Sequence, residues 1–364
     1  MSDATSRVSL AASPAGTKRY RERWAERFAP EFFRVSRWGL QVASVAHGTY
    51  LGDSDDATDS LYATALRQSL TSGVNFVDTA INYRCQRSER VIGRVLQEVI
   101  GEGLLRRDEV VLCTKAGYVP LDGTPPASRD EYASYLKREY LDPGVVRTED
   151  LVGGGHSIAP GFLLNQLERS MQNLGVQSVD CFYLHNPEQQ LSALAPTELT
   201  KRLRAAFELL ESWAGSSKIG VYGCATWNGF RLPAGSHGHL SIFELASIAR
   251  DIGGENHHFR IVQAPINLTM SEAVRVSTQR DNRGRLVTLL DAARELGIDI
   301  VASAPLLQGQ LTHDLPAQVR ELFTGTSDAQ RAVAFVHGLP GVLAAAIGMK
   351  SEEHVTENLA SLRK

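Results

Sequence analysis

Four titratable side chains stand near the ends of three successive predicted strands. Asp78 lies in NFVDTA and Tyr83 follows five residues later, Lys115 ends VVLCTK, and His185 ends DCFYLH. Each residue alone has an ordinary explanation, because aspartates cap helices, terminal lysines are solvated charges and single histidines are usually structural. Four such groups on neighbouring strand ends instead predict one site that transfers protons.

Eight short apolar segments, each followed by a helical pattern, are expected to form the strands that position these groups. Most are continuous apolar runs, which is typical of strands buried on both faces of a parallel sheet. The predicted strands are Val42–Thr49, Asn75–Ala80, Val110–Lys115, Val179–His185, Ile219–Ala225, Ile261–Pro265, Asp299–Pro305 and Leu343–Gly348.

The intervening segments have the periodicity of amphipathic helices. Leu163, Leu167, Met171 and Leu174 share one helical face ahead of a terminating Gly175. Another helix is expected after Ser241, which forms a capping-box pattern with Glu244.

Eight strand–helix pairs in one chain predict a single-domain (β/α)8 barrel. A doubly wound nucleotide-binding sheet would need a glycine fingerprint, and neither G-x-G-x-x-G nor G-x-x-x-x-G-K-[ST] occurs in the 364 residues. The carboxyl ends of barrel strands surround one cavity, so the four titratable groups are expected to meet there.

Three segments lie outside this strand–helix rhythm. Residues 1–34 are expected to be an N-terminal extension to a barrel of residues 35–364, and residues 19–28 to form a short helix on the barrel or at a subunit interface. Residues 119–160 are too long for a simple connection, so we expect a functional or mobile loop with a hinge at Gly153–Gly155. This loop and the glycine-rich Trp227–Gly238 follow strand ends, which places both on the active-site face.

The composition excludes several classes of protein. A formal net charge of −3 argues against nucleic-acid binding, which usually needs a strongly basic face. No apolar run approaches the roughly 20 residues of a membrane span, and the first 30 residues lack the features of a signal peptide, so a cytoplasmic location is expected.

The cysteines and histidines do not predict a disulfide framework or a metal site. Cys85, Cys113, Cys181 and Cys224 are widely spaced, and Cys85 is interpreted as an incidental loop residue. No third ligand stands at a useful spacing from the histidine pairs, which are therefore interpreted as loop residues: His237 with His239 and His257 with His258.

The chain resembles the aldo-keto reductase superfamily in six segments that occur in the family order between about Arg37 and Leu362. They are GVNFVDTAINYRCQRSERVIG, VVLCTK, LERSMQNLGVQSVDCFYLHNP, KIGVYGCATW, IVQAPIN and GMKSEEHVTENL. The D-x-x-x-x-Y spacing followed by S-E, together with L-H-N-P, is the most specific part. The resemblance implies a catalytic tetrad of Asp78, Tyr83, Lys115 and His185.

The chemistry of these residue types agrees with that implication. Tyr83 would be the general acid in carbonyl reduction and the base in the reverse direction. The ammonium of Lys115, oriented by Asp78, is expected to lower the pKa of Tyr83 from its ordinary value of about 10. His185 would donate a hydrogen bond to the substrate oxygen as negative charge develops on it.

The resemblance also implies a nicotinamide cofactor, and Lys350 favours NADPH over NADH. Gln263 matches a residue that contacts the nicotinamide amide, and Lys350 and Ser351 match the segment that meets the adenosine phosphate. Ser351 also opens a predicted helix, whose N-terminus favours an anion. The full set of implied cofactor residues is Gly48, Thr49, Thr226, Gln263, Ser303, Pro305, Leu306, Gly348, Lys350, Ser351, His354, Glu357 and Asn358.

Three positions depart from the family pattern at the nicotinamide. Ala225 and Thr226 stand where a Ser-Asn pair usually binds the carboxamide, and Ser303 stands where an aromatic ring commonly stacks on the nicotinamide. Thr226 retains a hydroxyl for the carboxamide, and Trp227 or Tyr50 can supply apolar surface.

The sequence therefore predicts an NADPH-dependent reductase of an aldehyde or ketone, or the corresponding alcohol dehydrogenase, acting on a small molecule. Two alternatives stay open, because a fold alone does not determine function. One is a cofactor-binding barrel that serves as a regulatory or interaction subunit. The other is an epimerase-type enzyme that retains its cofactor. The oligomeric state also stays open.

Overall fold

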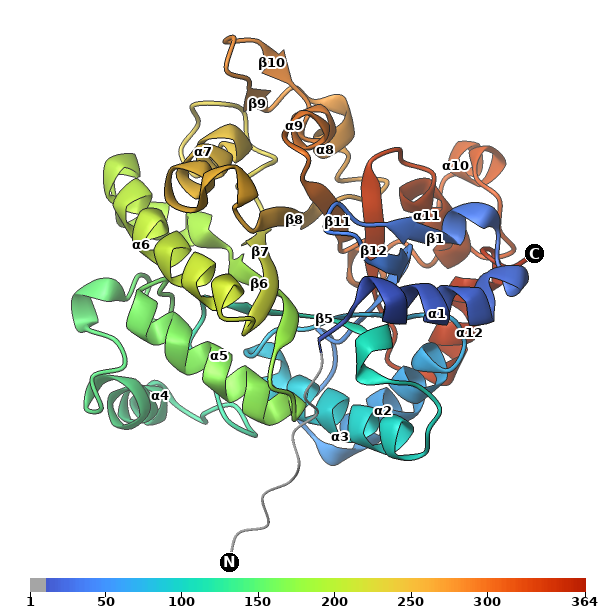
Figure 1. Ribbon diagram of the computed structural model, residues 1–364, viewed down its shortest axis with the longest axis horizontal. Coiled ribbons are helices and arrows are strands. Elements are labelled where there is room, and N and C mark those ends of the chain that lie inside the picture. Colours follow the sequence, from blue (N-terminus) through green and yellow to red (C-terminus); the bar gives the residue numbers. More distant parts are fainter. Residues whose placement is uncertain (1–10) are drawn as a thin grey trace, which may run out of the picture.

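The computed structural model describes residues 11–364, so the first ten residues of the predicted extension lie outside the described part (Figure 1). Within residues 11–364, eight parallel strands close a barrel in the order β11-β12-β3-β4-β5-β6-β7-β8. Helices surround these strands, as Figure 1 shows. The predicted (β/α)8 barrel is confirmed.

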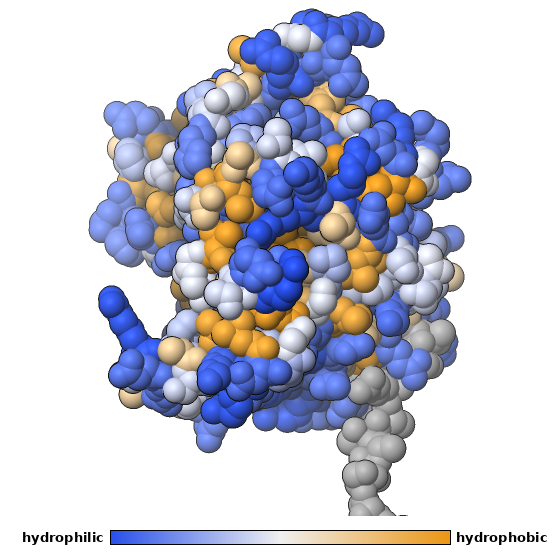
Figure 2. Space-filling view, turned by 90° about the vertical axis from the view of Figure 1, so that its left-hand side faces the viewer, coloured by the Kyte–Doolittle hydropathy of each residue, from blue (hydrophilic) through white to orange (hydrophobic). Residues whose placement is uncertain are grey.

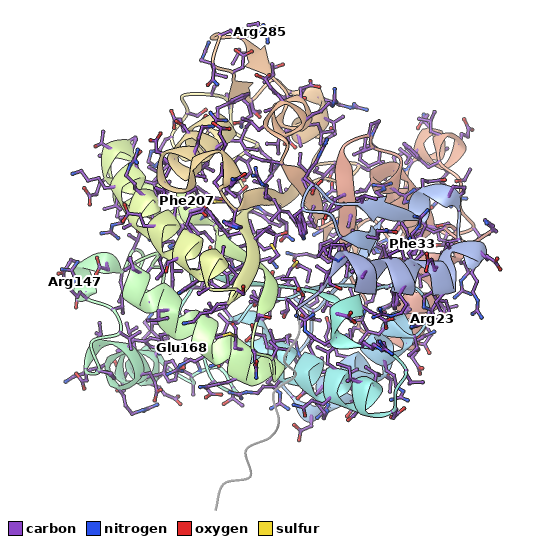
Figure 3. All side chains as sticks on the ribbon, viewed as in Figure 1. Arg23, Phe33, Arg147, Glu168, Phe207 and Arg285 are labelled. Carbon is purple, nitrogen blue, oxygen red and sulfur yellow. The ribbon has the colours of Figure 1, made fainter. Side chains whose placement is uncertain are left out.

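The barrel strands match the predicted ones closely, with one exception. They are β3 (Val45–Gly48), β4 (Phe76–Asp78), β5 (Val111–Ala116), β6 (Val179–His185), β7 (Ile219–Ala225), β8 (Phe259–Pro265), β11 (Asp299–Ser303) and β12 (Val342–Gly348). The predicted strand Val42–Thr49 is divided, because β2 (Gln41–Ala43) pairs antiparallel with β1 (Phe33–Val35) while β3 enters the barrel. A second hairpin joins β9 (Gln279–Arg280) to β10 (Leu286–Val287), and Arg285 lies at its tip (Figure 3).

One longer helix follows each barrel strand within the described residues. These helices are α2 (Asp56–Leu70), α3 (Arg87–Gly101), α5 (Pro160–Leu174), α6 (Pro196–Gly215), α7 (Ile242–Gly253), α9 (Leu289–Leu296), α11 (Asp328–His337) and α12 (Glu352–Ala360). The predicted face of α5 is buried, and Gly175 ends the helix in the left-handed region at φ 66°. At α7 the Ser241 side chain accepts from the Glu244 N–H, as the capping pattern predicted.

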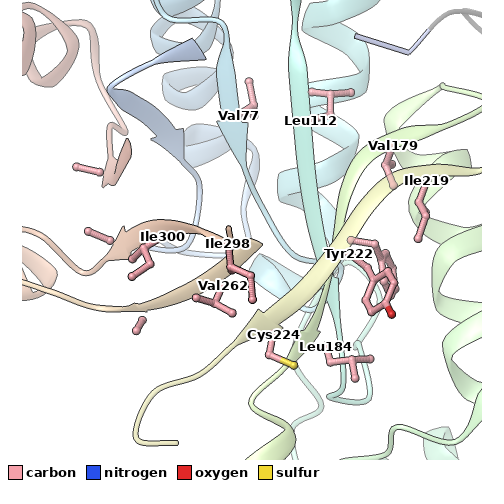
Figure 4. Packing of buried hydrophobic residues seen from close by; sticks show 14 of the residues in the cluster. Val77, Leu112, Val179, Leu184, Ile219, Tyr222, Cys224, Val262, Ile298 and Ile300 are labelled. Atoms are coloured by element: carbon pink, nitrogen blue, oxygen red, sulfur yellow. The ribbon is translucent and has the colours of Figure 1, made fainter. Parts of the chain in front are cut away.

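The largest apolar cluster lies between the strands and the helices. Figure 4 shows Val77, Leu112, Val262 and Ile300 contributing to it from different strands. Alternate strand residues face the helices and the barrel interior, so each strand serves two apolar layers. On the side that carries α4, α5 and α6, the surface is mainly hydrophilic, with hydrophobic residues visible in the hollows (Figure 2).

Residues 119–160, which we expected to form a functional or mobile loop, contain regular structure. The segment includes α4 (Arg129–Leu136) and a π-helical turn at Lys137–Leu141. Val119, Tyr140 and Val146 form a separate apolar cluster with Phe162 of α5. The segment has this local core because its apolar residues, although widely spaced in the sequence, are brought together by the fold. The predicted glycine hinge is a turn closed by pairing of Val152 with His156.

The predicted N-terminal helix is α1 (Pro14–Trp24), and it packs on the barrel. Tyr20 is buried and its hydroxyl donates to the carbonyl of Leu70 at 2.7 Å. Arg19 forms ion pairs with Asp108 and Glu109. The remaining short α-helices of the described chain are α8 (Glu272–Arg275) and α10 (Ala317–Leu322).

A buried ion pair joins β6 to the turn before β5. Asp180 accepts from Arg107 at 2.8 Å and from the N–H groups of Leu112 and Ala12. Both charged side chains are buried. Loss of either partner would leave an uncompensated charge away from water, which costs far more than the pair contributes.

We expect Asp180→Ala to lower the free energy of unfolding by about 3–5 kcal/mol, because it leaves the Arg107 guanidinium buried without its carboxylate. Urea denaturation followed by circular dichroism measures this change. The control is Arg204→Ala, which removes an exposed pair with Asp251 and should cost less than about 1 kcal/mol. Equal losses of unfolding free energy in the two variants would show that the buried pair contributes no more to stability than the exposed one.

Candidate active site

A cavity of about 770 Å³ opens at the carboxyl ends of the barrel strands. Its wall includes the strand-end residues Gly48, Asp78, His185, Ser303 and Gly348. Side chains from distant parts of the chain therefore converge on one space, as barrel geometry predicts.

The structure brings Asp78, Tyr83, Lys115 and His185 together at this cavity. The Lys115 Nζ donates to Asp78 Oδ2 at 2.7 Å and to the Thr79 carbonyl at 2.8 Å. It also lies 3.3 Å from the Tyr83 hydroxyl. The rings of Tyr83 and His185 meet edge to face with their centroids 5.9 Å apart.

Lys115 is a fully buried ammonium. Burial opposes its charge, but the charges and hydrogen bonds of Asp78 and Tyr83 outweigh that cost and hold the pKa of Lys115 above its ordinary value. The other oxygen of Asp78 accepts from Gln263 Nε2 at 2.8 Å, which fixes the carboxylate. The lysine is therefore charged and is held by hydrogen bonds beside the tyrosine.

Lys115 lowers the pKa of Tyr83 as expected, but this effect does not determine the net pKa. Burial raises the pKa of Tyr83, and the ammonium of Lys115 lowers it only in part, so the net pKa lies above the ordinary value. The sequence shows that Lys115 lies on the strand after Tyr83, but the burial of the tyrosine depends on the assembled cavity. Tyr83 is consequently a protonated donor at neutral pH.

His185 is a neutral imidazole. Burial lowers its pKa well below the ordinary value, and the positive charge of Lys115 lowers it further. Its Nδ1 is buried and has no hydrogen-bond partner among residues 11–364. The proton of the neutral ring is therefore assigned to Nε2, the nitrogen that can donate to a ligand.

The backbone directly after Tyr83 is strained. Arg84, Cys85 and Gln86 have φ values of 48°, 55° and 68°. Non-glycine residues in this region cost roughly 1–2 kcal/mol each. Arg84 anchors the turn, because its guanidinium donates to the Asp53 carbonyl at 2.8 Å and pairs with Asp59 at 2.5 Å.

Most of the predicted cofactor residues line the same cavity. They are Gly48, Thr49, Thr226, Gln263, Ser303, Pro305, Leu306, Gly348, His354, Glu357 and Asn358. Lys350 and Ser351 are not part of this lining. Ser351 caps α12 by accepting from the His354 N–H, and Lys350 lies beside Gly52.

The departures from the family pattern lie where the sequence predicted. Ala225, Thr226 and Ser303 all line the cavity, as do the aromatic residues Tyr50 and Trp227. Tyr50 packs its ring edge to face against Tyr83 with centroids 5.0 Å apart. Apolar surface is therefore present near the reacting end even though Ser303 supplies none.

Of the polar residues that line the cavity and were not predicted, Asn82, Tyr118 and Asn186 lie close to the tetrad in the sequence. The Asn186 side chain donates to the Tyr118 hydroxyl at 2.9 Å, which leaves the hydroxyl proton free for a ligand. Each residue lies within three positions of a tetrad member, so their adjacency to the strand ends was the available signal.

Other candidate sites have ordinary structural surroundings. All four cysteines are free and buried, including Cys85. Between residues 11 and 364, no cluster of His, Cys, Asp or Glu has an arrangement that would hold a metal ion. His258 instead contacts Glu211, and His239 contacts the Thr278 carbonyl. No helix in this range has the length and apolar character of a membrane span.

Comparisons with known proteins agree with this geometry. The chain is 28% identical over 120 residues to 6-dehydroglucose reductase of Novosphingobium aromaticivorans, a match that covers 32% of this chain and 38% of that protein. It is 21% identical to the uncharacterized oxidoreductase YrpG of Bacillus subtilis, with coverage of 83% of this chain and 73% of the relative.

A similar solved structure is an aldo-keto reductase from Klebsiella pneumoniae in complex with NADPH. Its TM-score is 0.57 at 20% sequence identity, and the match covers 91% of this chain and 89% of that one. At this identity the likeness concerns the fold. Residues 45–231, which carry the tetrad, match the family model described as the aldo/keto reductase family. The chain therefore belongs to the aldo/keto reductase family.

Proposed function

We propose that this protein is an NADP(H)-dependent oxidoreductase that interconverts an aldehyde or ketone and the corresponding alcohol. The observation that carries the proposal is the buried ammonium of Lys115, held 3.3 Å from the Tyr83 hydroxyl at the wall of the cavity. A buried charge is costly unless it is paired, so a barrel used only for binding would gain nothing from this arrangement.

The residues of the cavity fit a dinucleotide. Thr226 Oγ1 and Asn358 Oδ1 are buried and have no hydrogen-bond partner among the described residues. Buried polar atoms rarely stay unpaired, which indicates that a ligand pairs with them. Thr226 would hold the nicotinamide carboxamide together with Gln263, and Asn358 would hold the adenine together with Glu357.

Lys350 and Ser351 would hold the 2′-phosphate that distinguishes NADPH from NADH. Ser351 is the N-cap of α12, so free backbone N–H groups and the positive end of the helix dipole lie beside it. The similar Klebsiella reductase is a complex with NADPH, and this cofactor is consistent with the assignment.

The residues of the chain divide the chemistry of carbonyl reduction between them. The cofactor, when bound, supplies a hydride to the carbonyl carbon. Tyr83 donates its proton to the carbonyl oxygen, and the Lys115 ammonium stabilises the phenolate that results. The neutral His185 donates a hydrogen bond to the same oxygen from Nε2. Asp78 and Gln263 keep Lys115 in place throughout.

The cavity favours an uncharged substrate. Around Tyr83 and His185, where the substrate would react, the cavity lining found within positions 11–364 contains no arginine or lysine, so a carboxylate or phosphate on the substrate would lack a counter-charge at this end. Asn82, Tyr118 and Asn186 offer neutral hydrogen-bonding groups beside the aromatic rings. Because one relative is named 6-dehydroglucose reductase, oxidised neutral sugars are a sensible part of a substrate panel.

Tyr83→Phe should lower the rate of carbonyl reduction by about 10²- to 10⁴-fold, because it removes the proton donor. NADPH oxidation measured with neutral aldehydes, ketones and oxidised sugars gives the rate, and NADPH fluorescence gives cofactor affinity, which should be unchanged. Tyr50→Phe is the matched control and should keep kcat within a few-fold.

Unchanged turnover in Tyr83→Phe would refute the role of the tyrosine. Tight NADPH binding without reduction of any carbonyl by the wild-type protein would favour a regulatory subunit. A cofactor that copurifies and never exchanges would favour epimerase-type chemistry.

The pH profile of reduction should be flat between about pH 6 and 9. Tyr83 acts as an acid, and its raised pKa keeps it protonated to higher pH than an ordinary tyrosine. The lowered pKa of His185 keeps the imidazole neutral to lower pH than an ordinary histidine. Measurement of kcat/KM across this range tests both the raised pKa of Tyr83 and the lowered pKa of His185. An inflection near the ordinary histidine pKa that disappears in His185→Gln would contradict the lowered pKa of His185.

Lys350→Ala should weaken NADPH binding by roughly tenfold, or about 1.4 kcal/mol, and leave NADH binding nearly unchanged. The reason is that only NADPH carries the phosphate that the ammonium would meet. Fluorescence titration with each cofactor measures the difference, and Lys350→Arg should keep the preference. Equal losses of affinity for NADPH and NADH would show that Lys350 contacts a part of the molecule that the two cofactors share.

A further inference from the structure

A chain of hydrogen bonds runs from the surface of the barrel to the backbone of His185. Arg202 of α6 donates to Gln190 Oε1 at 2.8 Å, and Gln190 Nε2 lies 2.7 Å from His156 Nδ1. His156 Nε2 in turn lies 2.8 Å from the carbonyl oxygen of His185. Gln190 and His156 are both buried.

The direction of every bond in this chain is determined. Arginine has no acceptor, so it must meet the oxygen of the Gln190 amide, and the amide nitrogen must then face His156. Nδ1 of His156 therefore accepts and Nε2 carries the proton that the His185 carbonyl accepts. A neutral imidazole in a single tautomer is the only form that satisfies both neighbours.

The hydrogen bond from His156 gives the His185 carbonyl a donor at the point where the sheet ends. β5 ends at Ala116, and Gly117 follows beside the His185 carbonyl. A Cβ on Gly117 would stand 2.5 Å from that oxygen and 2.9 Å from His156 Nε2. The glycine leaves room for an imidazole to reach a carbonyl that the strand ladder no longer serves.

The side chain of His185 depends on this backbone support. No group in the described chain holds its Nδ1, so hydrogen bonding to the ring does not set its direction. The ring is held by packing, with Tyr118 edge to face at 5.2 Å between centroids. Tyr118 also packs edge to face on His156 at 4.9 Å, so both rings and the carbonyl belong to one unit.

The same unit fixes the segment of residues 119–160 to the reacting end of the cavity. Arg202 donates to the carbonyls of Glu149 and Asp150, which lie in that segment together with His156. The next residue, Ser157, donates its N–H to the Gly117 carbonyl. Displacement of the segment would therefore be transmitted to the backbone of His185.

We propose that His156 is a positioning residue, which holds His185 in its donating orientation through the His185 carbonyl and is itself oriented by Gln190 and Arg202. This inference rests on the proposed function, in which His185 donates to the substrate oxygen. His156 contacts neither cofactor nor substrate and acts only through His185.

The test compares His156→Leu with His156→Gln, whose amide can both donate to the His185 carbonyl and accept from Gln190. His156→Leu should lower kcat for reduction by about 10- to 100-fold with little change in NADPH affinity, which is about 1.4–2.7 kcal/mol of transition-state stabilisation. His156→Gln should recover kcat to within about threefold of wild type. The control is Tyr132→Phe, which removes a hydrogen bond to the Gly154 carbonyl in the same segment.

Hydrogen–deuterium exchange gives a readout that does not depend on activity. The Asn186 N–H donates to the Ala225 carbonyl at 2.6 Å, and its exchange should rise in His156→Leu and stay low in Tyr132→Phe and His156→Gln. Unchanged kcat and exchange in His156→Leu, equal effects in Tyr132→Phe, or no recovery in His156→Gln would overturn the inference.

A second variant covers the case in which His156→Leu does not fold. Gln190→Leu leaves the His156 N–H in place but removes what orients the ring, so kcat should fall and the Asn186 N–H should exchange faster. Wild-type values for both would overturn the inference. Failure of the proposed function would appear separately, as a wild-type protein that reduces no carbonyl while the exchange differences persist.

Discussion

A lysine ammonium without solvent contact lies beside the mouth of this barrel, and much of the surrounding structure follows from the need to keep it charged. Lys115 on β5 is paired with Asp78 on β4, and Asp78 is held in turn by Gln263 on β8. These residues are far apart in the sequence and meet only because the barrel closes with the observed register. A shift of one residue in any of these strands would turn its Lys115, Asp78 or Gln263 side chain to the opposite face of the sheet. The buried ammonium would then lose its partner.

The elements around this pair are arranged to keep Tyr83 next to it. The left-handed turn at Arg84, Cys85 and Gln86 is unfavourable by itself and persists because Arg84 is anchored to Asp53 ahead of α2 and to Asp59 within α2. Backbone strain beside a cavity is typical of functional sites, where contacts with the surrounding structure hold a conformation that the local chain disfavours. The stability of the barrel thus supports a geometry that a short peptide would not adopt.

The sequence predicted the barrel and the convergence of the four titratable groups, because both follow from residue patterns within single strands. Continuous apolar runs identified the strands, and the position of Lys115 or His185 at the end of its run identified the face. The predictions were incomplete where the outcome depended on contacts between distant residues. The pKa of Tyr83 is raised because of a depth of burial that no local pattern records. The fold of residues 119–160 and the contact of His156 with His185 likewise arise only in the assembled chain.

In the proposed reaction, hydride and proton meet at this site on a carbonyl substrate. The most direct measurement uses NADPH with both hydrogens at C4 of the nicotinamide replaced by deuterium, with a neutral aldehyde or oxidised sugar, followed by mass spectrometry of the alcohol formed. We expect one deuterium on the former carbonyl carbon with the wild-type protein, and we expect formation of this product to depend on Tyr83. Bound NADPH with no alcohol formed, or substrate converted without deuterium, would contradict the proposed reaction.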